Sequence, residues 1–440
     1  MVDPDRGRVY EHGWQSWSPS ATYPVTGTGH RPSQAVLGTM CYRPGRPAPA
    51  RGFQGEGLLA VDPGTGEAVR LFTPVDGLTE IPSIRAVLTG ERRLVITADG
   101  PVEQSSHEGS LGESLAGWAD RFAARAGTSP PRPAPTAWCS WYHYFGDVTG
   151  PDVIENLEAI ATLDLPVDVV QIDDGWQAEI GDWTARSDRF GDLTGLCARV
   201  RDAGRRPGIW IAPFLVGARS ELARTRPAWL VGGADAGHNW GQDLYALDTT
   251  HPAAAAYLRD VFARLRSYGF DYFKADFLYA GALEGRRHAG HVQAVTAYRQ
   301  GLALIREAIG PHSHLIGSGA PILPSVGLVD AMRVSPDIGL RYEPESGDFS
   351  RPSQHAATLT TIGRAWQHGR FWVNDPDCLI VRPEVERREE WAATMENYGG
   401  LRVSSDRIAE LDGWGLETTR RLLGTPPPPV PFDALRQEPG

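Results

Sequence analysis

Asp271-Tyr-Phe-Lys-Ala-Asp-Phe277 is a short, mostly apolar run between two longer amphipathic segments, residues 253–268 and 291–309. A run of strand length between two segments of helical period predicts a buried β-strand flanked by helices. In a strand, side chains at positions i and i+2 point the same way, so Lys274 and Asp276 would share one face. A cation on that face would favour the ionised carboxylate of Asp276.

Lys274 stands out because 42 of the 43 basic residues of the chain are arginines and it is the remaining one. Lysine is a compact charge on a thin stem, whereas arginine is a wide planar fork, so a tight polar site can accept one and reject the other. A buried structural ion pair is the alternative interpretation of this residue.

The same strand–helix pattern repeats through residues 136–405. It predicts eight strands and a helix in most of the links between them, which indicates a (β/α)₈ barrel. An open doubly wound sheet also alternates strands and helices, but no GxGxxG or GxxxxGK[ST] loop follows any strand. The predicted strands are residues 137–141, 167–172, 207–212, 272–277, 314–317, 331–334, 371–373 and 401–403. The predicted helices are residues 152–162, 193–203, 253–268, 291–309, 352–367 and 384–396.

The remaining segments differ in composition from the barrel. Residues 1–125 carry short apolar runs, such as 86–88 and 93–97, between Gly, Pro and Asp turns, and no convincing helical period precedes about residue 113. A proline-rich linker, residues 126–135, suits a stiff boundary. Residues 406–440 form a short remnant with a helical piece at 416–423 and an extended tail from Pro426 to Pro431.

The bulk composition excludes several classes of protein. The net charge of −11 argues against nucleic acid or an anionic membrane as a partner. The four cysteines are scattered, which argues against a zinc site or a disulfide scaffold, and we expect no cofactor. No run of about 18 apolar residues occurs, and the N-terminus has no apolar leader, so cytoplasmic residence is the default expectation.

The predicted strand ends carry the polar chemistry. Carboxylates follow five of the eight strands, accompanied by tryptophans and by one histidine, His143. An aspartate-rich rim could hold Mg²⁺, but such sites usually also engage phosphates, and no phosphate-binding loop is evident. Carboxylates and indoles together favour a carbohydrate site. Glycoside hydrolysis needs two carboxyl groups, for which Asp276 suits the ionised role and Asp337 the proton donor.

The role of Asp337 as a proton donor depends on two opposing effects. Arg333, four residues earlier, would lower the pKa of Asp337, whereas burial would raise it. The sequence leaves open which effect is larger.

Six strings, in order along residues 136–405, resemble glycoside hydrolase family 36, the melibiase-type α-galactosidases. A seventh, Gly13-Trp-Gln-Ser-Trp-Ser18, resembles part of the family's N-terminal β-sandwich. The resemblance thus implies a TIM barrel preceded by a partial β-sandwich, with both flanking β domains truncated. The six strings are Trp138-Cys-Ser-Trp-Tyr-His-Tyr-Phe145, Gln171-Ile-Asp-Asp-Gly175, Gly208-Ile-Trp-Ile-Ala-Pro-Phe214, Tyr272-Phe-Lys-Ala-Asp-Phe277, Arg333-Val-Ser-Pro-Asp337 and Phe371-Trp-Val-Asn-Asp-Pro-Asp-Cys-Leu379.

The resemblance also implies roles for single residues. Asp276 would be the nucleophile and Asp337 the acid and base of a retaining mechanism. Ser318 stands where members often have cysteine near the sugar 2-position. The implied substrate-binding residues are Asp173 and Asp174 on the O4 and O6 hydroxyls, Trp210 packed on the sugar, Lys274 and Arg333 on ring hydroxyls, Ser318, Trp141, and Trp17 as a wall from the β domain.

Three of these residues also have structural interpretations. Asp173 could cap a helix, Trp210 could be barrel core, and Trp17 lies in a segment of uncertain fold.

The expected function is a retaining α-galactosidase acting on oligosaccharides of the melibiose or raffinose type through a covalent galactosyl-aspartate. An α-galactosyl transglycosylase or an α-N-acetylgalactosaminidase would use the same site. Two different classes remain as alternatives. A Schiff-base aldolase would use Lys274 as the amine nucleophile, and a non-catalytic sugar-binding protein would retain the site without turnover.

Overall fold

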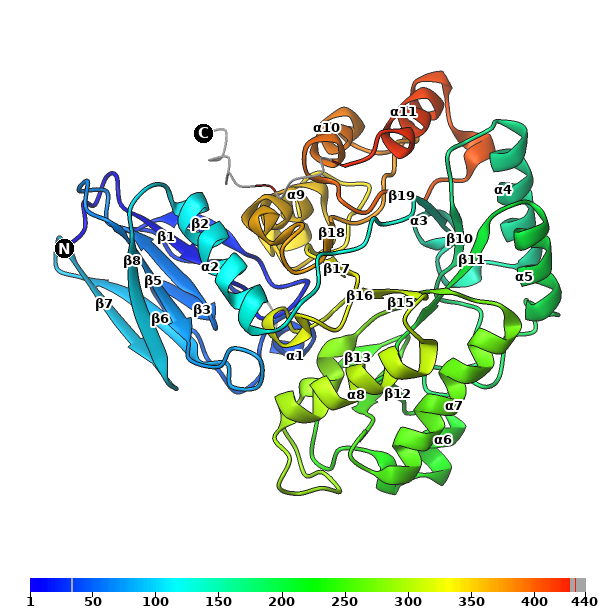
Figure 1. Cartoon of the computed structure of the whole chain (residues 1–440), viewed down its shortest axis with the longest axis horizontal. Helices are drawn as coiled ribbons and strands as arrows, with labels where there is room; N and C mark the ends of the chain where they lie inside the picture. The colour runs from blue at the N-terminus through cyan, green and yellow to red at the C-terminus, as the bar shows by residue number, and fades with distance from the viewer. Residues whose placement is uncertain (33–34, 428–431, 433–440) are drawn as a thin grey trace.

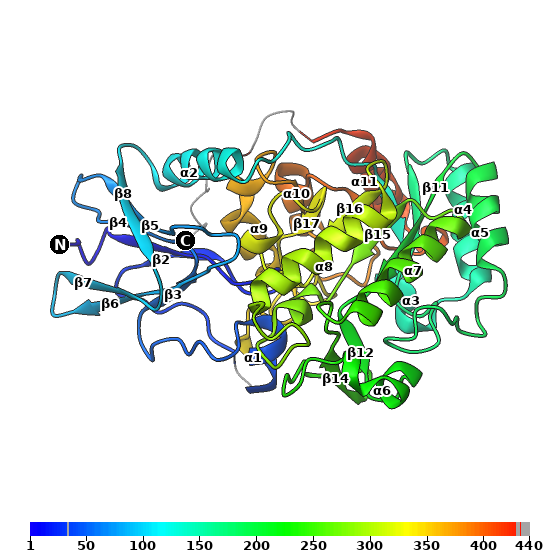
Figure 2. The same cartoon turned by 60° about the horizontal axis from the view of Figure 1, so that its bottom comes forward.

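The repeated strand–helix pattern forms eight parallel strands that curl into a barrel (Figures 1 and 2). In this computed structural model, which describes residues 1–32, 35–427 and 432, neighbours in the chain are neighbours in the sheet, and β19 pairs with β9. The Leu401 N–H donates to the Asn374 carbonyl at 2.8 Å, which joins the last two strands. The predicted (β/α)₈ barrel is confirmed. Its strands are β9 (Ala137–Cys139), β10 (Val169–Ile172), β11 (Arg206–Ile211), β15 (Tyr272–Ala275), β16 (His314–Gly317), β17 (Ala331–Arg333), β18 (Val373–Asp375) and β19 (Val403–Ser404).

Helices cover the outside of the barrel where the amphipathic segments predict them. Helix α4 begins at a capping box in which Thr149 and Asp152 bond each other's backbone N–H groups. Helix α7 ends at Gly269, whose φ of +111° suits a left-handed C-cap. The link between β16 and β17 holds only a short 3₁₀ turn, η4 (Leu323–Ser325). The helices are α4 (Gly150–Thr162), α5 (Leu193–Asp202), α7 (Pro252–Tyr268), α8 (Ala294–Ile309), α9 (Gln354–Gly363) and α10 (Arg388–Tyr398).

An inserted antiparallel sheet follows the third barrel strand. It has the order β12-β14-β13 and is not predicted from the sequence, because its strands are only two to five residues long. Phe214 and Leu247 join the sheet to the barrel through a backbone hydrogen bond of 2.9 Å. The elements are β12 (Leu215–Gly217), α6 (Glu221–Thr225), β13 (His238–Asn239) and β14 (Gln242–Ala246).

The N-terminal residues form two antiparallel sheets that pack face to face, as expected for a β-sandwich. The larger sheet has the order β2-β1-β4-β5-β8 and the smaller β3-β6-β7. The expectation of no helix before about residue 113 is wrong, because α1 (Ala35–Cys41) lies there; seven residues are too few to show a period. The strands are β1 (Arg8–Glu11), β2 (Ala21–Pro24), β3 (Phe53–Glu56), β4 (Leu59–Asp62), β5 (Val69–Pro74), β6 (Ser83–Thr89), β7 (Arg93–Ala98) and β8 (Val102–His107).

A buried guanidinium is among the contacts that join the N-terminal segment to the barrel. Arg364, directly after α9, is fully buried, and burial lowers its pKa to about 9. It donates to five backbone carbonyls, four of which belong to the segment that carries Trp17. These acceptors are Gly13 at 3.3 Å, Gln15 at 2.8 Å, Ser16 at 2.7 Å, Ser18 at 3.0 Å and Val334 at 3.0 Å.

Two further helices flank these units. Helix α2 (Leu111–Arg125) packs on β4, β5 and the 3₁₀ turn η6 (Ala365–Gln367), so it also joins the sandwich to the barrel (Figure 1). Helix α11 (Gly413–Gly424) starts from the side-chain cap of Asp412 and includes the predicted helical piece at 416–423. Most of the proline-rich tail lies outside the described residues. Among the helices that the structure describes, none is both long enough and apolar enough to cross a membrane.

Candidate active site

Asp276 lies directly after β15, at the end of the barrel where all eight parallel strands finish. Its side chain is almost buried, since the residue is 7% exposed. Oδ2 accepts a hydrogen bond from the Trp210 indole N–H at 2.9 Å, and Oδ1 accepts one from the Phe277 backbone N–H at 2.8 Å. Phe277 has a φ of +51°, which is unusual for an aromatic residue, so the chain turns sharply at the carboxylate.

Lys274 forms its ion pair with Asp173, at 3.0 Å, and not with Asp276 as its place two residues away suggests. Asp173 is buried and also accepts hydrogen bonds from the Gln171 amide at 2.6 Å and the Cys139 thiol at 3.2 Å. No helix begins at Asp173, so the helix-cap interpretation is wrong.

The charge of Lys274 bears on the aldolase alternative. Burial is the largest influence and would lower the pKa of Lys274, but Asp173 and the other negative groups around it, Asp276 among them, together raise the pKa well above its usual range. An ammonium has no free electron pair, so Lys274 is unsuited to attack a carbonyl as a Schiff-base amine.

Arg333 is shared by three carboxylates. Its Nη1 lies 3.0 Å from Asp337, its Nη2 lies 2.7 Å from Asp377, and its Nε lies 3.4 Å from Asp375. Tyr142 donates its hydroxyl to Asp377, which has a φ of +96° and is fully buried. The guanidinium charge is therefore divided among three acceptors and does not belong to Asp337 alone.

The pKa of Asp337 is raised to about 7. Burial within the rim is the largest cause, the Asp377 and Asp276 carboxylates act in the same direction, and Arg333 and Lys274 oppose them. The side chain is nevertheless 35% exposed, whereas Asp377 is closed off. Asp337 is thus a carboxyl group that can hold a proton near neutral pH and exchange it with solvent.

Asp174 is held by two side-chain donors. Its Oδ1 accepts from the Gln177 amide at 2.6 Å and its Oδ2 from the Trp240 indole N–H at 2.7 Å. Burial raises the pKa of Asp174, while these two hydrogen bonds act in the opposite direction. Trp240 comes from the β13–β14 hairpin of the inserted sheet.

Trp17 reaches the barrel from the N-terminal segment. Its ring packs edge-on against Phe277, with centroids 4.9 Å apart, and lies 6.2 Å from Tyr279. Its Nε1 and the hydroxyl of Ser318, which follows β16, are both buried and have no hydrogen-bond partner among the residues that the structure describes. Buried polar groups are usually paired, so both atoms mark places where a ligand could bind.

The remaining predicted aromatic residues occupy different positions. Trp210 is buried in the core, as its structural interpretation expects, and its indole N–H donates to Asp276; its packing on a sugar stays a prediction. Trp141 begins the short helix α3 (Trp141–Tyr144), and its ring contacts Phe145 at 5.2 Å. No hydrogen bond or ring contact within the described residues joins Trp141 to Asp276 or Asp337.

Sequence reasoning did not assign Asp375, Asp377, Tyr142, Gln177 or Trp240 to the site. The Asp-Pro-Asp string after the seventh strand was a usable signal for the first two. Trp240 gave none, because the inserted hairpin that carries it has strands too short to recognise.

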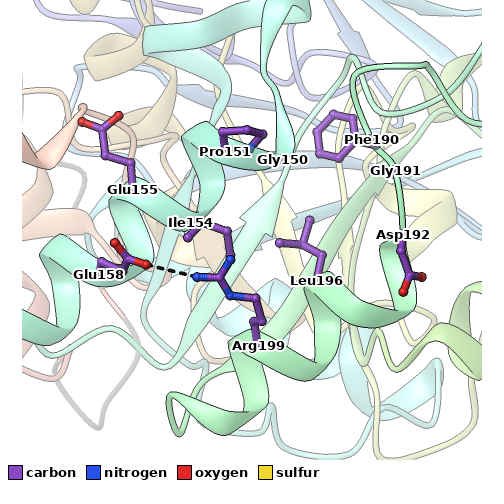
Figure 3. A pocket seen from close by; sticks show the side chains of 10 residues that line it. All are labelled: Gly150, Pro151, Ile154, Glu155, Glu158, Phe190, Gly191, Asp192, Leu196 and Arg199. Atoms are coloured by element: carbon purple, nitrogen blue, oxygen red, sulfur yellow. Dashed lines mark hydrogen bonds and ion pairs between the residues drawn. The ribbon is translucent and has the colours of Figure 1, made fainter.

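A separate depression of about 560 Å³ lies on the outer wall between α4 and α5 (Figure 3). Ile154, Leu196 and an ion pair of 3.1 Å between Glu158 and Arg199 line it, and none of the aspartates described above does. It is therefore distinct from the site at the strand ends. No group of three or more His, Cys, Asp or Glu side chains in the described part of the chain is arranged to hold a metal ion.

A (β/α)₈ barrel with carboxylates and indoles at the strand ends is an architecture of glycoside hydrolases. A family model described as Melibiase matches residues 132–308. The α-galactosidase TtGalA of Thermus thermophilus, solved with stachyose, is 29% identical with a TM-score of 0.81, covering 96% of this chain and 90% of TtGalA. A second structure of TtGalA, in complex with p-nitrophenyl α-D-galactopyranoside, aligns at 30% sequence identity with a TM-score of 0.80. The alignment covers 96% of this chain and 86% of the TtGalA chain.

More distant relatives align over smaller parts. The bifunctional α-galactosidase/sucrose kinase AgaSK of Mediterraneibacter gnavus is 32% identical over 100 residues, which are 21% of this chain and 10% of AgaSK. The GH36 α-galactosidase AgaA of Geobacillus stearothermophilus shares the fold, with 15% identity and a TM-score of 0.60, and this chain spans 61% of it. The chain belongs to the melibiase family, glycoside hydrolase family 36.

Proposed function

We propose that this protein is a retaining α-galactosidase that hydrolyses terminal α-linked galactose from oligosaccharides. The observation that carries the proposal is the pair of unlike carboxyl groups after β15 and β17. Two donors stabilise the negative charge of Asp276, whereas the pKa of Asp337 is about 7. One ionised carboxylate and one proton donor are what a retaining glycosidase requires.

In the proposed reaction, Asp276 attacks the anomeric carbon and forms a covalent galactosyl ester. Asp337 donates its proton to the leaving oxygen, then takes a proton from the water that cleaves the ester, so the anomeric configuration is retained. Asp173, Asp174, Lys274 and Arg333 would bind the sugar hydroxyls. The bound substrates of TtGalA, stachyose and a nitrophenyl α-galactoside, support this choice of substrate class.

The test is a panel of nitrophenyl glycosides with NMR of the first-formed anomer. We expect hydrolysis of the α-galactoside, without added metal and in the presence of EDTA, with α-galactose appearing first. β-Galactose as the first product would contradict retention, and hydrolysis of a different glycoside alone would contradict the sugar assignment. The panel includes the α-N-acetylgalactosaminide, which tests the alternative at the 2-position.

Two variants then test the roles of the carboxyl groups. Asp276→Ala should remove activity, and azide should rescue it with formation of the inverted galactosyl azide. Asp337→Ala should lower the rate of melibiose hydrolysis far more than the rate of hydrolysis of a nitrophenyl substrate, because the nitrophenolate leaving group needs no proton. Equal losses on both substrates would contradict the assignment of Asp337 as the acid.

A further inference from the structure

Trp240 has a positive φ angle, a backbone conformation that is unfavourable for a bulky side chain. The hairpin of β13 and β14 pairs Asn239 with Gln242, so Trp240 and Gly241 are the two central residues of the turn. Their φ angles are +50° and +66°. Such turns favour Asn-Gly or Gly-Gly, and a bulky residue at positive φ is strained. Strained residues of this kind persist only where the surrounding structure compensates, and they often mark functional sites.

The side-chain contacts of Trp240 lead to the site, while its backbone N–H donates to the Asn239 side chain at 2.8 Å within the turn. The indole N–H donates to Oδ2 of Asp174 at 2.7 Å. The ring centroid lies 5.0 Å from that of Phe277, the residue after Asp276, and 6.4 Å from that of Trp210, which bonds Asp276. The strained turn thus places one indole between the carboxylate after the second strand and the aromatic residues around the third and fourth strands.

The hairpin is also held firmly. Tyr279, in the 3₁₀ turn η3 (Leu278–Ala282) after Asp276, donates its hydroxyl to the Ala236 carbonyl at 2.6 Å. Gln242 donates to Glu179 at 2.8 Å and accepts from the Arg219 N–H at 2.9 Å. These hydrogen bonds hold the hairpin in place, and the indole that it carries bonds Asp174.

The bonding of Asp174 explains what this arrangement achieves. An ionised carboxylate has about four acceptor positions, and Gln177 and Trp240 each use one, on different oxygens. Each oxygen keeps one position, in an orientation set by the two donors. A carboxylate presented in this way suits a pair of neighbouring hydroxyl groups.

We propose that Trp240 is a specificity-determining positioning residue, whose indole N–H orients Asp174 toward the hydroxyls of the terminal sugar and whose ring bounds that side of the site. The inference rests on the proposed function, because it assumes that Asp174 binds the glycone. It assigns to the inserted sheet a part in sugar recognition.

The test uses Trp240→Phe and nitrophenyl α-galactosides that each lack one hydroxyl, at the 2-, 3-, 4- or 6-position. On the parent substrate, loss of a hydrogen bond to a charged group should lower kcat/KM about 10- to 100-fold. On analogues that lack a hydroxyl bound by Asp174, the loss in kcat/KM should shrink to about twofold. The orientation of Asp174 matters little there, because the hydroxyl that it would bind is absent. Asp174→Asn should show its smallest losses on the same analogues.

Trp229→Phe is the matched control. Trp229 lies in the same insertion, in the 3₁₀ turn η2 (Pro227–Trp229), with its ring near Tyr257 and His251, and its replacement should leave kcat/KM unchanged. Trp240→Asn is the second variant, because it creates the favoured Asn-Gly turn and preserves the hairpin while removing the ring. It should lose at least as much activity as Trp240→Phe, with an unchanged melting temperature.

The outcomes separate the two proposals. Wild-type protein that is inactive on the parent galactoside contradicts the proposed function. If the wild type is active, two results would overturn the role of Trp240 alone. In the first, kcat/KM of Trp240→Phe on the parent substrate stays within about twofold of the wild-type value. In the second, Trp240→Phe loses the same factor in kcat/KM on every analogue. Equal loss is what a purely structural residue would give.

Discussion

Replacing Asp377 by asparagine should move the pH dependence of activity to lower pH. Asp377 shares the Arg333 guanidinium with Asp337, and its negative charge raises the pKa of Asp337. Asparagine removes that charge and keeps nearly the same shape. Arg333, released from one of its partners, would also pair more strongly with Asp337, so both effects favour the ionised form of Asp337.

The size of the shift follows from the geometry. Asp337 and Asp377 lie 3.0 and 2.7 Å from different nitrogens of one guanidinium. Two carboxylates placed in this way are about 6 Å apart and repel by about 3 kcal/mol at an effective dielectric constant of about 20, equivalent to about 2 pKa units. Because solvent reaches a third of the Asp337 side chain, screening reduces the expected shift to about 1 to 2 units.

The assay is the pH profile of kcat/KM for melibiose, whose leaving group needs a proton. The alkaline limb reports the acid in the free enzyme, so it should lie near pH 7 in the wild type and about 1 to 2 units lower in Asp377→Asn. Asp375→Asn is the control for the release of Arg333, because Asp375 also pairs with Arg333, at 3.4 Å, but is not among the principal causes of the raised pKa of Asp337, so its alkaline limb should move less than that of Asp377→Asn. An alkaline limb that stays in place in Asp377→Asn, or moves upward, would refute the reasoning.

Three further predictions concern other buried contacts. Trp210→Phe removes a donor from Asp276 and should lower kcat/KM about 10- to 100-fold; an unchanged value would mean that the hydrogen bond is not needed. Lys274→Arg puts a wider cation against Asp173, and steady-state kinetics should show a loss of similar size, whereas wild-type activity would show that charge alone suffices. Arg364→Met leaves buried carbonyls unpaired and should lower the free energy of unfolding by about 3 kcal/mol, measured by denaturant titration, with no change expected if those carbonyls find other donors.

The barrel was predictable because its signals are local. Each strand and most of the helices show their own period in a short window of sequence, and the parallel arrangement then places the strand ends together. The aspartates at those ends could be named as a group for the same reason. The inserted sheet was not predictable, because its strands are very short and its tip is Trp240-Gly241 and not a turn sequence such as Asn-Gly.

The pairing of charges within the site was harder to predict from the sequence than the fold. The period of a strand says that Lys274 and Asp276 share a face, but the ion pair of Lys274 goes to Asp173, which is 101 residues away. The state of Asp337 depends on how burial compares with Arg333, and that comparison needs the positions of Asp377 and of the surrounding chain. Such balances are set by tertiary structure, so sequence patterns can identify the participants but not the outcome.

The charges of the site as a whole explain why the pKa of one of its carboxyl groups, Asp337, is raised. Within the described part of the chain, Lys274 and Arg333 are the cations that pair with these carboxyl groups, so the carboxyl groups outnumber them. Mutual repulsion and burial then favour protonation, and Asp337 is where solvent can most readily exchange the proton. An excess of negative charge also suits the oxocarbenium-like transition state of the proposed reaction, which is positively charged. The carboxyl groups concerned are those of Asp173, Asp174, Asp276, Asp337, Asp375 and Asp377.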